Sequence, residues 1–355
     1  MTTFIQLHLL TPYAASNLNR DDVGRPKTMH WGKAERLRIS SQSLKRAWRE
    51  SDVFADAVGD AKGKRSVEFA SGLVQALRQR GLSNEESIAR VAAVIEHDKL
   101  GKLEKGAAET NQLVHLGPDE LARLDALADR LVQSKAIEEK DALVLAERPR
   151  AADIALFGRM LADNSFYNVD AAAQVAHAFT THKATVEDDF YTAVDDIKTA
   201  RKEADRGAGF VGVHEFGSGL FYLYVCVNAA QLARNLSGDK ALAAKAIDGL
   251  IEAAATIAPR GKQNSYASRA RALYGRVEIG DAQPLSLAAA FLDPIGRRPD
   301  DDNMFAVSVD RLRDLRAKVS KAYGDAPETA EMNVPAGAGA LADLKTLAAK
   351  AVAHA

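Results

Sequence analysis

Apolar residues recur at every second position at the start of the chain. Ile5, Leu7 and Leu9 follow this period in residues 3–10. A period of two is typical of a β-strand that turns one face toward the core. We therefore predict a strand over residues 3–10.

Three further segments have the composition or the alternation of strands. Residues 220–228 and 273–279 contain the aromatic and β-branched residues that strands favour. Residues 173–181 fit either helix or strand by propensity, because their ends are rich in alanine. Val175, His177 and Phe179 nevertheless alternate there, and we interpret the segment as a strand.

Helical periodicity occurs in the stretches between these strands. Leu44, Ala47 and Trp48 lie at positions i, i+3 and i+4 of a helix that begins near Ser41. A second helix is predicted over residues 240–257. The order is therefore strand, helix, strand, strand, helix, strand, which is the α+β ferredoxin-like (RRM-like) βαββαβ pattern.

Two long segments interrupt this pattern. Residues 57–166 read as a run of amphipathic helices, with Ser83 and Glu86 spaced as a capping box and Pro118 at a helix start. Residues 187–217 form a polar segment between two predicted strands, and we interpret them as a projecting β-hairpin. The core then comprises residues 1–56, 167–186 and 218–355, whose tail includes an amphipathic helix over 309–323.

Composition limits the possible partners. The chain has 355 residues, of which 47% are hydrophobic, and its net charge is −1. An ordinary globular composition with neutral charge excludes a uniformly basic surface, so a nucleic-acid site must be a local stripe.

One segment departs from this neutrality. Residues 17–49 hold nine Lys or Arg against three Asp or Glu. These cations lie next to the predicted start of a helix rich in serine, where backbone amides and the helix dipole favour anions. The segment therefore suits phosphate groups, and a solvated basic face remains the alternative.

Signals for catalysis, metals or cofactors are weak. The single cysteine, Cys226, lies in an apolar run and reads as a buried small residue, and intramolecular disulfides are impossible. The histidines lack metal-ligand spacing. Gly207, Gly209 and Gly212 match a dinucleotide fingerprint, but a charged segment precedes them where a strand is required. We expect no enzyme activity, no cofactor and no metal.

The sequence also indicates where the protein resides. The N-terminus lacks the cationic region of a signal peptide, and no apolar stretch is long enough for a bilayer. We expect a cytoplasmic protein without membrane contacts.

Adjacent carboxylates and adjacent aromatic residues leave alternatives open. Asp21 with Asp22, and Asp195 with Asp196, are candidate Mg²⁺ ligands, although neighbouring side chains diverge in an extended loop. In the predicted hairpin, Phe190 and Tyr191 either stack on nucleic-acid bases or anchor the hairpin to the core.

Six motifs resemble one known family. They are LNRDD at 18–22, RISSQSLKRA at 38–47, DIALFGRM at 153–160, AHAFTTH at 176–182, FYTAVDD at 190–196 and EFGSGLFY at 215–222. Their order and content resemble the CasC family, the crRNA-binding backbone subunit of type I-E CRISPR Cascade. The resemblance covers the predicted core and hairpin.

The resemblance implies an RRM-like palm, a helical fingers domain at residues 57–166 and a thumb at residues 187–217. It implies RNA-backbone contacts from a loop and helix, base separation by the thumb and one finger residue, and a further guide contact near residue 262. The implied RNA-binding residues are Arg20, Lys27, Ser40, Gln42, Lys45, Arg46, Arg49, Met160, Phe190, Tyr191, Thr192, Lys262 and Gln263.

The expected function is antiviral defense by a non-enzymatic subunit that oligomerises along a crRNA and leaves its bases free to pair with target DNA. The implied partners are the crRNA, the target DNA strand, further copies of the chain in a head-to-tail filament, and the large, small and capping Cascade subunits. Two alternatives remain open. One is a metal-dependent ribonuclease of the related type III backbone class that uses Asp21 and Asp22, and the other is a protein scaffold that binds no RNA.

Overall fold

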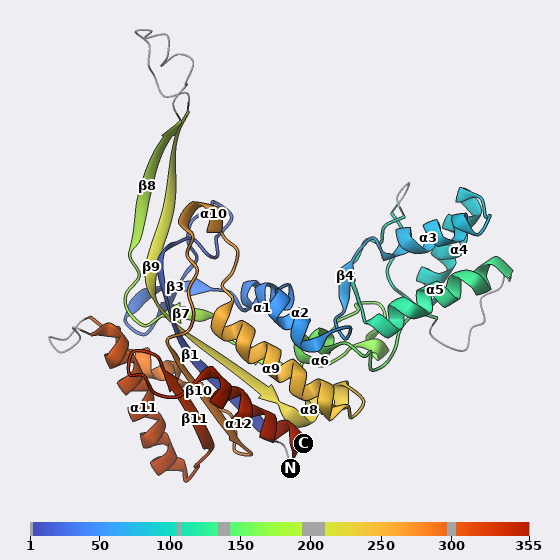
Figure 1. Ribbon diagram of the computed structural model, residues 1–355. Coiled ribbons are helices and arrows are strands. Elements are labelled where there is room, and N and C mark those ends of the chain that lie inside the picture. The colour runs from blue at the N-terminus through green and yellow to red at the C-terminus, as the bar shows by residue number, and fades with distance from the viewer. Residues whose placement is uncertain (1–2, 105–107, 134–142, 194–209, 297–302, 355) are drawn as a thin grey trace, which may run out of the picture.

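The computed structural model describes residues 3–104, 108–133, 143–193, 210–296 and 303–354 (Figure 1). The strands are β1 Phe4–Ser16, β2 Thr28–Trp31, β3 Ala34–Ile39, β4 Lys64–Ser66, β5 Val114–Leu116, β6 Ala173–Val175, β7 Ala178–Thr180, β8 Val186–Ala193, β9 Phe210–Asn228, β10 Tyr274–Gly280 and β11 Glu328–Asn333. The α-helices are α1 Ser41–Arg49, α2 Asp52–Val58, α3 Phe69–Gln79, α4 Asn84–His97, α5 Pro118–Gln133, α6 Ala152–Phe157, α8 Ala229–Asn235, α9 Lys240–Thr256, α10 Gln263–Tyr266, α11 Met304–Tyr323 and α12 Leu341–Ala353, and the 3₁₀ helices are η1 Ser165–Tyr167 and η2 Leu287–Phe291.

A large sheet organises these elements. Its strand order is β11-β10-β1-β9-β7-β3-β2, and β6 and β8 also pair with β9. The central β1 is antiparallel to both neighbours, with Leu7 opposite Val277 of β10 and Val225 of β9. The protein is therefore a mixed α+β protein around an antiparallel sheet, as predicted.

Two strand predictions need correction. The segment predicted as one strand over 173–181 is divided into β6 and β7, because its register against β9 shifts by one residue between Val175↔Val225 and Phe179↔Tyr222. The edge strand β11 was not predicted. Its sequence, ETAEMN, lacks a strand composition, and pairing with β10 supplies its stability.

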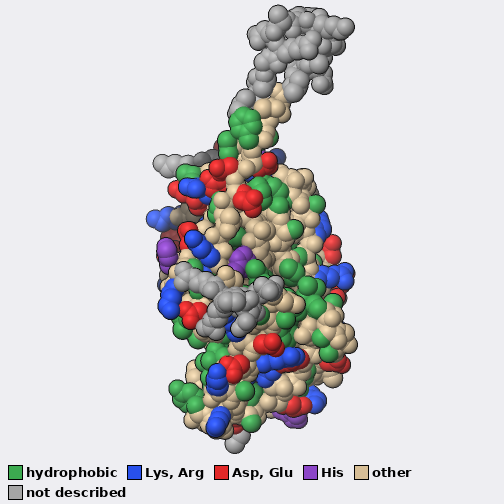
Figure 2. Space-filling view, turned by 90° about the vertical axis from the view of Figure 1, so that its left-hand side faces the viewer, with side chains coloured by type: hydrophobic (Ala, Val, Ile, Leu, Met, Phe, Trp, Pro, Cys, Tyr) green, Lys and Arg blue, Asp and Glu red, His purple; other side chains and the backbone are tan. Residues whose placement is uncertain are grey.

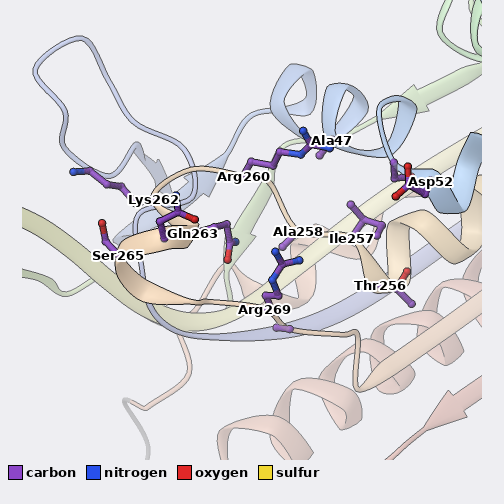
Figure 3. A pocket seen from close by; sticks show the side chains of 13 residues that line it. Ala47, Asp52, Thr256, Ile257, Ala258, Arg260, Lys262, Gln263, Ser265 and Arg269 are labelled. Atoms are coloured by element: carbon purple, nitrogen blue, oxygen red, sulfur yellow. The ribbon is translucent and has the colours of Figure 1, made fainter.

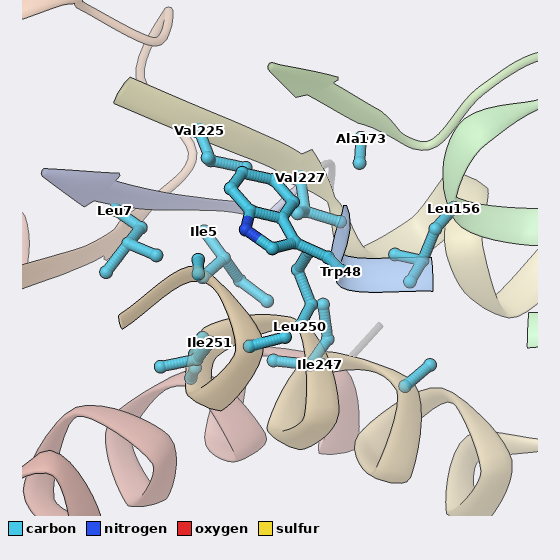
Figure 4. Packing of buried hydrophobic residues seen from close by; sticks show 14 of the residues in the cluster. Ile5, Leu7, Trp48, Leu156, Ala173, Val225, Val227, Ile247, Leu250 and Ile251 are labelled. Carbon is cyan, nitrogen blue, oxygen red and sulfur yellow. The ribbon is translucent and has the colours of Figure 1, made fainter. Parts of the chain in front are cut away.

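One face of the sheet is covered by helices. Trp48 of α1 is fully buried between the sheet residues Ile5 and Val227 and the α9 residues Ile247 and Leu250 (Figure 4). This cluster also receives apolar side chains from α2, α8 and α12. The predicted apolar face of α1 is therefore confirmed, and its packing fixes the direction of the opposite, polar face.

The other face of the sheet is also covered, which the period of two in β1 did not predict. Leu10, Tyr222 and Tyr274 pack there against η2 and α11. His8 is fully buried on β1, and its Nδ1 lies 2.9 Å from the Tyr222 hydroxyl. Polar residues at alternate positions of β1 are thus buried because η2 and α11 cover this face of the sheet.

Burial of His8 predicts a loss of stability in mild acid. Burial, with nearby Arg276, lowers the pKa of His8 from 6.5 to about 3. Below about pH 6.5 the His8 imidazole therefore binds a proton in the unfolded chain but stays neutral in the folded chain. The free energy of unfolding falls as the pH is lowered from about 6.5 toward 3. His177 and His182 have lowered pKa values too, so His8→Gln should reduce this loss without removing it.

Urea unfolding midpoints at pH 7.5, 6.0 and 5.0 measure this effect. The wild-type midpoint should fall more steeply between pH 7.5 and 5.0 than that of His8→Gln. Parallel curves for the two proteins would contradict the role of His8.

The inserted helices have a hydrophobic cluster of their own. It comprises buried residues of α3, α4 and α5 together with Val114 and Leu116 of β5, and it is separate from the cluster under the sheet. The capping box of Ser83 and Glu86 and the helix start at Pro118 are both confirmed. The division into palm, fingers and thumb at the stated boundaries stays a prediction.

A long hairpin of β8 and β9 extends from the sheet (Figure 1). Its strands pair from Val186↔Gly217 to Ala193↔Phe210. The candidate carboxylates Asp195 and Asp196, and Gly207 and Gly209 of the glycine motif, lie outside the described residues. In the part of the chain that the structure describes, no helix is long and apolar enough to cross a membrane.

Candidate nucleic-acid interface

Helix α1 carries the densest group of predicted RNA contacts. Ser40 caps the helix, because its hydroxyl accepts a hydrogen bond from the Ser43 amide at 3.3 Å. The apolar face is buried, so Gln42, Lys45 and Arg46 lie on the face away from the sheet. Gln42 and Arg46 are exposed and Lys45 is half-buried, which leaves all three accessible to a ligand.

A hollow of about 480 Å³ lies beside this face of α1. Its lining is Gln42, Lys45, Arg46, Arg49, Glu50, Arg65, Leu113 and Phe157. We call it the helix hollow. Four of its lining side chains are cationic and one is anionic, so its field favours an anion.

A second hollow of about 580 Å³ adjoins the first, since both include Arg65, Leu113 and Phe157 in their linings. This second hollow, the finger hollow, also includes Met160, whose side chain is 83% exposed. The structure therefore places the predicted base-separating residue next to the cations of α1. An exposed apolar side chain beside a cationic groove suits contact with bases on a strand whose phosphates are held nearby.

The backbone that carries Met160 is fixed by the side chain of the preceding residue, Arg159. The Arg159 guanidinium is buried and donates to both carboxylate oxygens of Glu120 at 2.8 Å. It also donates to the carbonyls of Ala146 and Tyr167. This buried ion pair joins α5 to the segment that carries Met160, and no pattern in the sequence indicated it.

Lys262 and Gln263 lie on the other side of α1. A hollow of about 700 Å³ separates the end of α1 from the loop that contains them (Figure 3). The Gln263 amide donates to the Pro259 carbonyl at 3.0 Å, and Lys262 adopts a left-handed conformation with φ of 52°. Arg260 and Arg269 line the same hollow, so α1 is flanked by cations on both sides.

The loop before β2 brings Lys27 to the start of α1. The Asn19 side chain accepts from the Ser40 amide at 2.8 Å, and the Asn19 carbonyl accepts from the Lys27 amide at 2.9 Å. Arg20 is exposed in this loop, and its backbone forms an isolated antiparallel β-bridge with Pro26. The predicted loop and helix contacts therefore share one region of the surface.

Asp21 has a local structural role. Its Oδ1 accepts from the backbone amides of Val23 at 3.1 Å and Arg25 at 2.8 Å, which shapes the loop. Asp22 is exposed. Within the described ranges, no group of three His, Cys, Asp or Glu side chains is placed to hold a metal ion.

The hairpin turns its two aromatic residues to opposite faces. The Tyr191 ring stacks on His214 at 4.4 Å, and the Lys262 ammonium lies 3.2 Å from His214 Nε2. Phe190 is 66% exposed beside its partner Val213, which is also exposed. Tyr191 thus packs within the hairpin, and it is His214 that contacts Lys262, whereas Phe190 remains available to a ligand. Thr192 is exposed as well.

Several basic residues of the segment 17–49 are committed to other contacts. Arg36 is fully buried and donates to the carbonyls of Thr180 and Phe291. Arg25 pairs with Glu215, and Lys33 pairs with Asp293. The basic stripe is therefore narrower than the sequence suggested. Over the face shown in Figure 2, basic and acidic side chains are interspersed.

Sequence reasoning missed Arg65 and Leu113, which line both the helix hollow and the finger hollow. They lie within or beside the short strands β4 and β5 of the insertion, where periodicity gives no functional signal. Asp153 is also informative. It is buried, and its carboxylate contacts His115 at 2.9 Å and lies 4.0 Å from Arg49, which joins the insertion to α1.

Comparisons with known proteins give a consistent result. A family model described as "CT1975-like protein" matches residues 5–354. A chain in a solved structure described as "CRISPR RNA-guided surveillance complex, pre-nicking" is 30% identical, with a TM-score of 0.84, over 98% of this chain and 100% of that chain. A chain from a second structure, "CRISPR RNA-guided surveillance complex", is 26% identical with a TM-score of 0.62, over 98% of this chain and 99% of that one. A comparison with curated proteins found no significant match.

Proposed function

The chain belongs to the family of CT1975-like proteins and is a CasC-like backbone subunit, and from this premise we propose that it binds guide RNA along its sugar-phosphate backbone. Several copies would follow one another along the crRNA. The two similar solved structures are RNA-guided surveillance complexes, which supports the assignment of guide RNA and other subunits as partners.

One observation supports this proposal most strongly: the helix hollow and the finger hollow are adjacent and share three lining residues. Cations and a hydroxyl-capped helix lie at one end, and exposed Met160 lies at the other. Cations hold phosphates without regard to sequence, and an apolar side chain contacts any base. A protein that accepts any guide needs this combination, because sequence choice belongs to base pairing.

We propose the finer architecture on the same grounds. The palm is ferredoxin-like, and the strand order β10-β1-β9-β7 around two helices supports this. The inserted helices act as fingers and the β8–β9 hairpin as the thumb of a head-to-tail filament of the type I-E kind. In that filament the bases pair with a target DNA strand, and the large, small and capping subunits bind its flank and ends.

Nuclease protection tests the proposed function. The protein should purify with RNA, and the protected length should increase by a fixed increment with each additional bound copy. RNA-free protein that gives no protection with added guide would favour a scaffold without RNA.

Salt dependence should report the phosphate contacts. If each copy engages about four to six phosphates, log Kd for single-stranded RNA should rise with log salt with a slope of about 3 to 4, at ~0.7 per phosphate. Fluorescence anisotropy of labelled RNA between 50 and 500 mM salt, as experimental conditions, measures this slope. An affinity that is insensitive to salt would contradict binding through the phosphates.

We propose that the subunit is not an enzyme. The Asp21 carboxylate is engaged by two backbone amides of its own loop, which supports a structural role. Guide-loaded protein incubated with complementary RNA and Mg²⁺ should leave that RNA intact. Cleavage that disappears in Asp21→Ala or Asp22→Ala would instead establish the ribonuclease alternative.

A further inference from the structure

The joint between the inserted helices and the sheet core contains buried polar side chains. The two parts pack around separate hydrophobic clusters, and β4 lies between α2 and the inserted helices (Figure 1). Leu156 of α6 belongs to the cluster under the sheet, whereas Leu116 of β5 belongs to the cluster of the inserted helices. Asp153 and His115 of the same two elements are buried, and their Oδ2 and Nε2 atoms lie 2.9 Å apart. A carboxylate and an imidazole therefore connect the two parts.

Asp153 is a charged group at the centre of this joint. Its Oδ1 accepts a hydrogen bond from the Gly63 amide at 2.8 Å. Burial raises the pKa of Asp153, but the contacts with His115, Gly63 and Arg49 outweigh burial and lower it, so the carboxylate is ionised. A Cβ on Gly63 would lie 2.7 Å from His115 Nε2, so the glycine lets the ring reach the carboxylate.

Two arginines, one from each part of the molecule, contact this pair. Nη1 of Arg49, on α1, lies 4.0 Å from the Asp153 carboxylate. Nη2 of Arg65, on β4, lies 3.5 Å from His115 Nδ1. Because arginine only donates, Nδ1 of His115 accepts, and Nε2 carries the proton that is donated to Asp153. The pair therefore holds one guanidinium of the sheet core and one of the insertion at the same joint.

Both guanidinium groups line the helix hollow, where cations outnumber anions. Glu50 is the anionic side chain of that lining, and it already contacts Arg46 at 3.0 Å and Arg49 at 3.2 Å. Among the residues that the structure describes, Arg65 forms no ion pair. Partial burial, followed by the charge of Arg49, lowers the pKa of Arg65, as expected of two cations that lie close together. An anion in the helix hollow would therefore be favourable beside these two groups.

We propose that Arg49 and Arg65 hold one phosphate of the guide between them, so that the guide joins the inserted helices to the sheet core. This inference rests on the proposed function, and it adds a subsite that spans the joint and a contact from the insertion, Arg65. Guanidinium groups bind phosphate oxygens through pairs of parallel hydrogen bonds. A shared phosphate would replace the repulsion between the two arginines by attraction of both to one anion. The joint is then held more firmly with the guide than without it.

Arg65→Gln in the full chain tests the contact. It removes a charge that no described carboxylate pairs with, so the fold should persist. Losing one hydrogen bond to a charged group should weaken RNA binding about ten- to hundredfold. The slope of log Kd against log salt should fall by about 0.7, the value for one phosphate on a single strand. Anisotropy of end-labelled RNA over a salt series measures both quantities.

Arg130→Gln is the matched control for this variant. Arg130 is exposed on α5 of the same insertion, and it lines neither the helix hollow nor the finger hollow. The control has the same net charge as Arg65→Gln and should keep the affinity and the salt slope of the wild type. Equal affinities and equal slopes in the two variants would overturn the proposal.

Amide hydrogen exchange tests whether the guide closes the joint. Saturating RNA should slow exchange in peptides that contain β4 and β5 of the wild type, because the phosphate binds only the closed joint. Saturating RNA should still protect α1 in Arg65→Gln, whereas its effect on β4 and β5 should be lost. Without RNA, Arg65→Gln should exchange like the wild type. Faster exchange in the RNA-free variant would show a structural role for Arg65 and overturn the proposal.

The two levels of the argument can fail separately. RNA that binds the wild type and protects α1 without protecting β4 and β5 would overturn the shared phosphate and leave the proposed function intact. Equal protection of β4 and β5 in the wild type and in Arg65→Gln would do the same. A wild-type protein that binds no RNA would overturn both.

Discussion

Reversing two charges on α1, in Lys45→Glu with Arg46→Glu, is expected to abolish RNA binding by the isolated protein. Both side chains line the helix hollow, and in the described part of the chain no ion pair holds Lys45. A hydrogen bond to a charged group contributes about 1.5–3 kcal/mol, so losing two contacts amounts to about 3–6 kcal/mol. The affinity should fall by about 10² to 10⁴.

This pair of substitutions avoids a structural side effect. Arg49 is 14% exposed and lies 4.0 Å from the buried Asp153, so reversing its charge would also disturb the fold. Among the residues that the structure describes, Arg46 forms an ion pair only with Glu50, in an exposed (i, i+4) contact that contributes about 0.3–0.5 kcal/mol. Circular dichroism should therefore show an intact fold.

The matched control for these substitutions is Lys318→Glu with Lys321→Glu on α11. It changes the net charge by the same amount and likewise breaks an exposed (i, i+4) pair, between Lys318 and Asp314. Anisotropy with labelled RNA compares the two variants at one salt concentration. A comparable loss of affinity in both would show that overall charge, and not the helix hollow, governs binding.

Glu120→Ala is expected to cause the largest loss of stability in the inserted helices. Glu120 is fully buried, and its carboxylate accepts from the amides of Gly117 and Ala146 as well as from Arg159. Its removal leaves the buried Arg159 guanidinium without a counter-charge, which costs about 3–5 kcal/mol. Urea unfolding and amide hydrogen exchange in α5 measure this loss.

The same helix provides the control. Asp129 pairs with Arg80, and its side chain is 67% exposed, so Asp129→Ala should cost less than about 1 kcal/mol. Because Met160 follows Arg159 directly, Glu120→Ala should also weaken RNA binding. If the two variants unfold at the same urea concentration, the buried ion pair is not what holds this segment.

Local patterns were sufficient for the order of the main elements. Leu44, Ala47 and Trp48 predicted which face of α1 is buried, and the structure confirms it. The capping residue Ser83 and the initiating Pro118 marked helix starts correctly. These signals involve residues at most four positions apart, so they can be read from the sequence without knowledge of the tertiary structure.

Contacts between distant residues could not be predicted in this way. β11 forms because β10 offers it an edge, and His8 is buried because η2 and α11 cover β1. Arg36 appeared to be one more cation of the basic segment, yet it bonds to carbonyls 144 and 255 residues away. No local pattern encodes such partners.

The sequence by itself determined the sheet-and-helix pattern, the excess of cations in residues 17–49 and the family resemblance of six motifs. The tertiary structure decided which of those cations face a common hollow, and it brought Arg65, Leu113 and Met160 of the insertion beside them. The physical reason is that charge and periodicity are properties of neighbouring residues. A binding surface depends instead on the packing of segments that lie far apart along the chain.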